Sequence, residues 1–365
     1  MLSNIGHAAE RVAPVVIDVT SALALSNAED VSLAGAGVAF ASGPAGLVRS
    51  PAAAANRRRE SVAPVQGGLI FLHTRLGETS DVANLGEPLG VAVRMVSLAL
   101  AGGYRDGAGG AFAAGSGYKL GDTWVGVSEG HLSAAASLLD GHVIVGAGPR
   151  LLGVRLTTGG EAHDYLGMGG EAGVIVTNVA DAWNFGLSIR SGVTAGPSGG
   201  VYGPFAAAKL APELAAGIGW SNLESLPEGA GTPVRLVLDV ICQGEVPGAV
   251  ALEALVQGEE VARGGWYTAS PRLGAEVDIW PDRLRLRAGG YLEPSRTALV
   301  GARPHATGGL ELRLFRIRAL SERVDLDLAW QIGVDYAPRY FRGAWLGINV
   351  WQGGQVGGNY RGSSG

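Results

Sequence analysis

The chain of 365 residues contains 60 glycines, has a formal net charge of −5 and carries charged side chains at only 17% of its positions. This weak negative charge gives no reason to expect a nucleic-acid partner, and the single cysteine, Cys242, excludes an internal disulfide framework or a cysteine-rich metal site. Hydrophobic residues reach 47% without an uninterrupted apolar run of about eighteen residues, which argues against membrane-spanning helices and favours a transmembrane β-barrel.

The first thirty residues have two possible interpretations. A modest apolar stretch covers residues 12–25, and Ala22-Leu23-Ala24 resembles a signal-peptidase site. Glu10 and Asp18 are unusual in a secretory signal. Residues 1–30 are therefore either an atypical signal or an N-terminal extension, and in neither case do we expect a membrane anchor.

Residues 31–60 are predicted to form a compact plug of irregular backbone. Glycines and prolines are crowded over residues 35–51, which disfavours both helix and strand. The segment is nevertheless too apolar for a solvated tail. Both features are satisfied if it is held inside a larger structure.

The same segment resembles the N-terminal hatch of the FadL family of outer-membrane transporters. The likeness lies in GAGVAFASGPAGLVRSPAA (35–53), although Ser50 stands where the family usually has Asn. Two later stretches, 166–193 and 270–295, resemble hairpins of that family. The resemblance implies that the plug shapes a pocket for a hydrophobic ligand. The plug residues expected to do so are Gly35, Gly37, Val38, Phe40, Gly43, Gly46, Leu47, Ser50 and Pro51.

Residues 61–352 are predicted to form about fourteen antiparallel strands that close into a barrel. An even number of strands is expected of a single-chain bacterial barrel. The predicted ranges are 64–73, 90–104, 110–119, 123–131, 141–157, 165–178, 182–195, 208–221, 232–244, 266–279, 283–294, 306–316, 323–336 and 342–352. Residues 353–365 form a polar tail, either native or an artificial addition.

Alternation of apolar and polar residues gives these strands two different faces. In 182–195, Trp183, Phe185, Leu187 and Ile189 alternate with small or polar residues. A soluble β-sandwich would alternate as well, with its apolar face turned inward. Many of these strands run about ten to fourteen residues, the length that a tilted strand needs to cross a bilayer, whereas soluble strands average about five or six.

Charged residues on the polar face are predicted to point into the barrel lumen. One interpretation is a wet interior braced by ion pairs; the other is that a subset, such as Arg190, holds a substrate carboxylate or gates a conduit. The set comprises Arg190, Arg235, Asp239, Arg272, Glu276, Asp278, Arg283, Arg285, Arg287, Glu311, Arg313, Asp325, Asp327 and Asp335.

The sequence gives little support for catalysis or for a cofactor. Glu161, His163 and Asp164 form a weak metal-like group in a glycine-rich context, so we expect no metal site. Gly167-x-Gly169-x-x-Ala172 matches part of a dinucleotide fingerprint but precedes a strand-like sequence. The protein is therefore not expected to be an enzyme.

The resemblance implies a transporter of the bacterial outer membrane that passes a long-chain fatty acid or hydrocarbon by diffusion through a hatch-gated, lateral path. The expected partners are outer-membrane lipid and a hydrophobic small molecule. The alternative is a barrel that does not transport and serves as a scaffold or as a partner in a secretion or motility complex. A protein partner belongs to that alternative, and neither hypothesis involves nucleic acid.

Overall fold

The computed structural model describes most of the chain, and the structural statements below refer to these parts. The described residues are 15–20, 28–42, 46–56, 65–75, 90–102, 107–120, 123–158, 160–179, 182–198, 205–222, 232–251, 267–280, 283–296, 302–319, 324–337 and 341–353.

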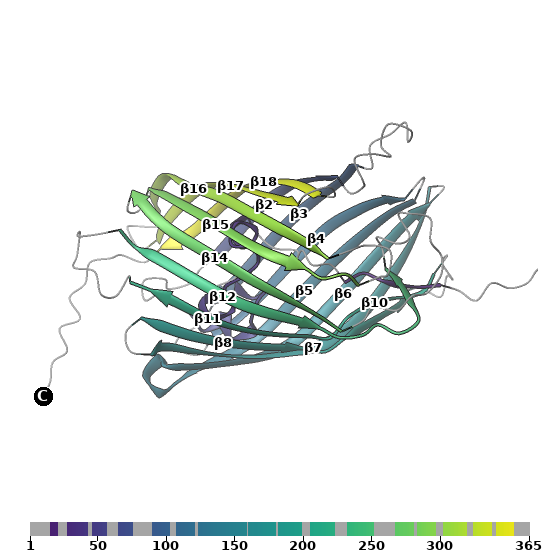
Figure 1. The fold of residues 1–365 in the computed structure, drawn as a ribbon, viewed down its shortest axis with the longest axis horizontal. Helices are drawn as coiled ribbons and strands as arrows, with labels where there is room; N and C mark the ends of the chain where they lie inside the picture. Colours follow the sequence, from purple (N-terminus) through teal and green to yellow (C-terminus); the bar gives the residue numbers. More distant parts are fainter. Residues whose placement is uncertain are drawn as a thin grey trace, which may run out of the picture.

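Fourteen antiparallel strands pair in a closed ring, and Figure 1 shows them curving around the N-terminal segment. In order around the ring they are β2 (Val65–Arg75), β3 (Gly90–Gly102), β4 (Gly107–Leu120), β5 (Thr123–Leu138), β6 (Val143–Thr158), β7 (Glu161–Val179), β8 (Trp183–Arg190), β11 (Glu213–Ser221), β12 (Val234–Gln243), β14 (Thr268–Trp280), β15 (Leu284–Glu293), β16 (Arg303–Ala319), β17 (Val324–Ala337) and β18 (Phe341–Gly353). β18 pairs with β2 and closes the barrel. The prediction of an all-β barrel of about fourteen strands is confirmed.

Two predicted strands are each broken in two. The range 182–195 becomes β8 and a short strand, β9 (Val193–Pro197). The range 208–221 becomes β10 (Phe205–Leu210) and β11. Two further short strands, β1 (Val15–Asp18) and β13 (Ala249–Ala251), were not predicted. These four short strands, β9, β10, β1 and β13, make up an inner sheet that is described below.

The two faces of the wall have opposite character. On β8, the side chains of Phe185, Leu187 and Ile189 are 42–50% exposed. Ser188 and Arg190, which point to the opposite face of the same strand, are buried. Such exposure of large apolar side chains is expected where lipid covers the wall. Among the described residues, no helix is long and apolar enough to cross a membrane.

The N-terminal segment lies inside the ring, where Figure 1 shows it in purple. We call residues 28–42 and 46–56 the plug; they contain α1 (Ala28–Ser32) and two 3-10 turns, η1 (Val38–Phe40) and η2 (Pro51–Ala54). α1 contacts β15 to β18, η1 contacts β7, β8 and β11, and η2 contacts β4 to β7. A third 3-10 turn, η3 (Leu139–Gly141), joins β5 to β6. The plug therefore touches opposite sides of the barrel wall.

Glycines on the inner face of the wall make room for the plug. A Cβ atom added to Gly186 would lie 2.6 Å from the backbone of Val38 and Ala39, and one added to Gly146 would lie 2.5 Å from the Pro51 carbonyl oxygen. The plug approaches seven such glycines on seven strands: Gly146, Gly173, Gly186, Gly219, Gly274, Gly289 and Gly309. Part of the chain's high glycine content thus has a structural use, because any side chain at these positions would push the plug away.

Candidate functional site: the plug and the break in the wall

Side chains of the wall hold the plug by its backbone. The Asp239 carboxylate accepts hydrogen bonds from the N–H groups of Gly37 and Val38, at 2.6 and 2.9 Å. Arg190 donates to the Val48 carbonyl oxygen at 2.6 Å. Because these donors and acceptors are buried, losing either wall side chain would leave plug backbone groups unsatisfied inside the protein.

Local backbone geometry explains how the plug reaches its anchors. Gly35 and Gly37 have φ angles of +68° and +127°, a region that side chains with a Cβ rarely adopt. At the other end of the plug, Ser50 begins η2 by accepting a hydrogen bond from Ala52 N–H, with Pro51 at the first helical position. The turns that the sequence predicts only as irregular are thus specified by glycine, serine and proline.

The described plug residues among the predicted set lie in different surroundings. Leu47 is fully buried in a core with plug alanines, Ile144 and Ile175. The Phe40 ring sits over Gly219, with the Arg235 guanidinium 4.8 Å from its centre. Val38 borders a cavity between plug and wall.

Two further predicted plug residues are glycines. Gly46 approaches Ala41 and Ala53 within the plug, whereas Gly43 lies outside the described residues.

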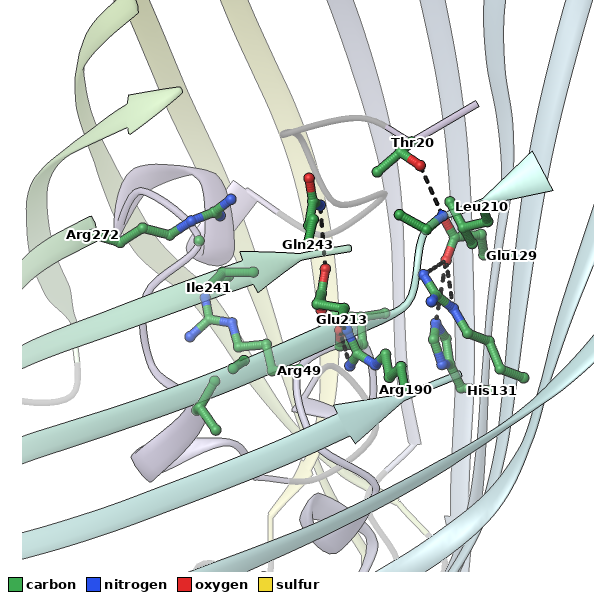
Figure 2. Close-up of a pocket in the computed structure, with 16 residues that line it drawn as sticks. Thr20, Arg49, Glu129, His131, Arg190, Leu210, Glu213, Ile241, Gln243 and Arg272 are labelled. Carbon is green, nitrogen blue, oxygen red and sulfur yellow. Dashed lines mark hydrogen bonds and ion pairs between the residues drawn. The ribbon is translucent and has the colours of Figure 1, made fainter. Parts of the chain in front are cut away.

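The cavity beside the plug measures about 50 Å³ and is lined by both charged and apolar side chains. Figure 2 shows Arg49, Arg190 and Arg272 around it, together with Glu129 and Glu213. Arg190 is paired with Glu213 at 2.7 Å and with Glu171 at 3.3 Å. These interactions make the lumen at the level of the plug an ion-paired interior.

A second ionic network lies on β12, β14, β15 and β16. Arg287 pairs with Glu276 at 2.7 Å and with Glu311 at 2.8 Å. Glu276 is also 3.4 Å from Arg235 and 3.6 Å from Arg285. Arg272 donates to the Ala34 carbonyl oxygen of the plug at 3.3 Å. The side chains of Asp325 and Asp327 lie outside the described residues.

Several charged residues at the cavity were not among the predicted sites. Glu129 pairs with Arg150 at 2.8 Å, and His131 lies 2.9 Å from Glu171. The sequence feature that could have indicated Glu129 and His131 is the alternation along β5. One face of this strand continues from apolar to polar residues, in the order Val125, Val127, Glu129 and His131. The weak Glu161–His163–Asp164 group lies on β7, and no three His, Cys, Asp or Glu side chains among the described residues are placed to hold a metal ion together.

The barrel wall is interrupted where two neighbouring strands bend together. β8 and β11 pair up to Arg190 and Glu213, and β9 and β10 then continue the same pairing beyond a bend at residues 191–192 and 211–212. On the β9 side of the bend, the Thr194 carbonyl oxygen lies 2.5 Å from the position that a Cβ atom of Gly167 on β7 would occupy. β9 therefore passes over the inner face of β7, and the glycines of the false dinucleotide motif allow this approach.

The N-terminal strand β1 occupies the break left by this bend. The pairing of β11 with β12 ends at Gln243, beyond which β10 pairs in parallel with β1, and β1 pairs in parallel with β13. The buried Asp18 carboxylate of β1 receives hydrogen bonds from Arg296 at 3.0 and 3.2 Å. Residues from the stretch interpreted as a signal or extension thus form part of the folded barrel.

An apolar layer lies between the inner sheet and the wall. Ile17 of β1, Val193 of β9 and Leu210 of β10 pack against inward-facing side chains of β5, β6 and β7. Those side chains, all buried, are Val125, Val127, Leu152, Val154, Leu156 and Tyr165. The inner face of these three wall strands therefore changes from charged beside the plug to apolar beneath the inner sheet.

Comparison with known proteins supports this architecture at the level of the fold. No protein-family model and no curated protein matches the chain. Among solved structures, it is similar to the CymD monoaromatic hydrocarbon channel, with a TM-score of 0.58 and 14% identity over 91% of this chain and 99% of that chain.

Two further structures agree. A Pseudomonas aeruginosa FadL homologue has a TM-score of 0.56 and 12% identity, over 90% of this chain and 97% of that one. The Ralstonia pickettii toluene transporter TbuX has a TM-score of 0.55 and 14% identity, over 90% and 98%. The chain therefore has the fold of the FadL-type outer-membrane β-barrel channels.

Proposed function

We propose that this protein is a channel of the bacterial outer membrane that lets small hydrophobic molecules, of the hydrocarbon or long-chain fatty-acid class, diffuse passively into the bilayer. The fold shared with a monoaromatic hydrocarbon channel and a toluene transporter supports this substrate class. The charged lumen at the plug argues against a straight path through the barrel for such molecules, because an apolar solute loses free energy in a wet, charged environment.

The observation that carries the proposal is the break in the wall closed by β1. There, the ladder between neighbouring wall strands gives way to a four-residue strand from the N-terminus. Beneath it lies the apolar layer between the inner sheet and β5 to β7. When β1 moves, an apolar molecule gains a route from this layer sideways into lipid, and so avoids crossing the charged lumen.

The plug is proposed to control this route together with β1. Its expected pocket-shaping residues surround the turn held by Asp239 and the segment held by Arg190. Movement of the plug would require these buried hydrogen bonds to exchange partners. In this proposal the plug therefore gates the path and moves slowly. β1 closes the exit from the path into the bilayer.

A disulfide that fixes β1 tests the lateral route. Ile17 and Ala208 are paired neighbours with fully buried side chains in the same core, so cysteines at both positions face each other. In a Cys242→Ser background, Ile17→Cys with Ala208→Cys is expected to lower toluene or fatty-acid uptake at least about tenfold when oxidised, and reduction should restore it. The matched control, Ser188→Cys with Ala215→Cys, links wall strands β8 and β11 and should leave uptake unchanged.

One observation favours a second candidate, the scaffold that does not transport. Arginine and glutamate pairs link neighbouring wall strands beside the plug, and Arg287 also lies 3.7 Å from Glu29 of the plug, as a static seal would require. Uptake into proteoliposomes that is the same in the oxidised β1-linked variant, the control variant and protein-free vesicles would exclude the channel. A stoichiometric protein partner without any co-purifying amphiphile would then establish the scaffold.

A further inference from the structure

A buried histidine on the inner face of β16 lies between two carboxylates. The Nδ1 atom of His305 is 2.9 Å from Asp335 on β17, and its Nε2 atom is 3.0 Å from Glu293 on β15. A neutral imidazole has one N–H and one acceptor nitrogen, and an ionised carboxylate can only accept. Both contacts can therefore be hydrogen bonds only if a second proton is present, either on the ring or on one of the carboxylates.

Neighbouring side chains hold these two carboxylates in place. Arg303 donates from Nε to the same oxygen of Glu293 at 2.7 Å, and the Tyr291 hydroxyl donates to Asp335 at 2.8 Å. We call these five side chains the histidine cluster. It comprises the described charged and titratable groups that face the ring from β15, β16 and β17: Tyr291, Glu293, Arg303, His305 and Asp335.

One connection from the histidine cluster to the plug passes through stacked side chains. The rings of Tyr291 and His305 are stacked, with their centres 4.2 Å apart and their planes inclined by 16°. The guanidinium of Arg272, from β14, lies 5.3 Å from the centre of the Tyr291 ring. Arg272 also donates to the Ala34 carbonyl oxygen of the plug at 3.3 Å. The histidine ring thus supports the aromatic ring against which this plug-holding arginine lies.

A second connection runs along β16 itself. Thr307, two residues from His305 on the same face of the strand, donates to the Ser32 carbonyl oxygen at 3.0 Å. The acidic residues of α1 contact arginines outside the histidine cluster, Glu29 with Arg287 and Asp30 with Arg49. The histidine cluster therefore reaches the plug at the backbone of residues 32–34, where α1 ends.

We propose that the histidine cluster makes the seating of the plug depend on pH: it holds residues 32–34 while a proton lets His305 bridge both carboxylates, and it loosens them when that proton is lost. Without the proton, a nitrogen lone pair faces a buried carboxylate, and one hydrogen bond is missing where water does not replace it. The ring then moves, and Tyr291 and Arg272 lose their support.

The direction of the effect follows from which form makes the contacts. The protonated form makes both hydrogen bonds, so the plug is held at low pH and loosened as the pH rises. An unperturbed histidine has a pKa of about 6.5, which places its titration within a range that the protein can experience. The effect on the plug is independent of the molecule carried. Only a consequence for uptake would rest on the proposed function.

Amide hydrogen exchange of the full-length protein in a neutral detergent tests the proposal. Rates are measured by mass spectrometry from about pH 6 to about pH 9, a range that spans histidine titration, and each is divided by the chemical exchange rate at the same pH. The N–H groups of Ala34, Gly35 and Ala36 are bonded within the plug. We expect their protection to fall about tenfold or more as the pH rises, while that of β5 stays constant.

Three histidine variants assign the response to one side chain. His305→Arg keeps a permanent cation with several donors, so the plug should stay protected at every pH. His305→Gln can donate to one carboxylate only, because its amide oxygen would face the other, so protection should be low throughout. His142→Gln, at an exposed histidine beside η3, is the matched control and should keep the wild-type response.

Two results would overturn the proposal. One is protection of the plug that does not change with pH in the wild-type protein. The other is a fall of the same size in His305→Arg, since another group would then be titrating. Uptake of toluene into proteoliposomes is measured separately: it should rise with pH in wild type and not in His305→Arg. The expected exchange without any uptake would contradict the proposed channel and leave the pH-dependent seating of the plug established.

Discussion

Glycine has two separate roles among the residues of this chain. At Gly35 and Gly37 it supplies positive φ angles that turn the plug towards Asp239 and Arg272. At wall positions such as Gly186 its lack of a side chain lets the plug backbone contact the wall directly. The second role depends on neighbours that are distant in sequence, so composition alone reveals the glycine excess without indicating which glycines matter.

Adding one methyl group at Gly186 tests the fit between plug and wall. Gly186→Ala should lower the free energy of unfolding by about 1–3 kcal/mol, because the new Cβ overlaps the backbone of η1. It should also make the plug easier to cleave by protease. Gly170→Ala on the neighbouring strand is the control: a Cβ there meets nothing within 4 Å, and stability should hold or rise slightly. Equal effects of the two variants on denaturant unfolding in micelles would refute the glycine contact.

The sequence predicts where strands lie better than what their faces touch. Trp183, Phe185, Leu187 and Ile189 form the outer face of β8, and Val193 continues the same alternation into β9. Yet Ile189 is 50% exposed and Val193 is 2% exposed, because the bend carries the same apolar face from the lipid side onto the inner surface of β5 to β7. Lipid and a protein core select similar side chains, so alternation predicts the strand and cannot reveal the bend.

For the candidate site residues, too, the sequence predicts the face of the strand but not the residues that the side chain contacts. The alternation placed Arg190, Arg272 and Glu276 on the inner face, where the structure has them buried. Their particular partners come from strands distant in the sequence, as in the contact of Arg190 with the Val48 carbonyl oxygen. The apolar role expected of Leu47 was tied to a pocket, whereas the side chain is packed in a core formed largely by alanines. Pairing across the barrel therefore required the three-dimensional structure.

At the level of elements, β1 should be held in the break by Arg296. Arg296→Gln removes the charge opposite Asp18, whose carboxylate would then be buried without its cation. We expect the Val19 N–H, which donates to the Lys209 carbonyl oxygen, to exchange with solvent about tenfold to a hundredfold faster, corresponding to about 1.5–3 kcal/mol. Hydrogen exchange read by mass spectrometry measures this.

The control for the β1 prediction is Arg155→Gln. Its ion pair with Asp164 is exposed and contributes little, so exchange near β1 should not change. If Arg296→Gln leaves the exchange of β1 as slow as in this control, the parallel ladders with β10 and β13 hold the strand by themselves. The ion pair would then have no part in closing the wall.

The interior of the barrel has two different parts: one needs charged side chains on the inner face of the wall, and the other needs apolar side chains there. Around most of the ring, the described wall has lipid-type residues outside and charged residues inside. Beneath the inner sheet, β5, β6 and β7 are apolar inside as well, and the barrel there contains a dry core. A barrel with a charged lumen throughout would need no such core. Its position beside the break in the wall is what links the fold to the proposed lateral path.

The orientation of the whole barrel in lipid gives the last prediction. An arginine facing the middle of a bilayer is unfavourable by about 2–4 kcal/mol, against about 0–1 kcal/mol near its edges. Leu187 and Trp183 are both 42% exposed on the outer face of β8, but Trp183 is at the end of the strand. Leu187→Arg should therefore lower the stability of the barrel folded into phosphatidylcholine vesicles by about 2 kcal/mol more than Trp183→Arg. Equal losses in both variants would mean that lipid does not cover this face, because in water an exposed arginine is tolerated at either position.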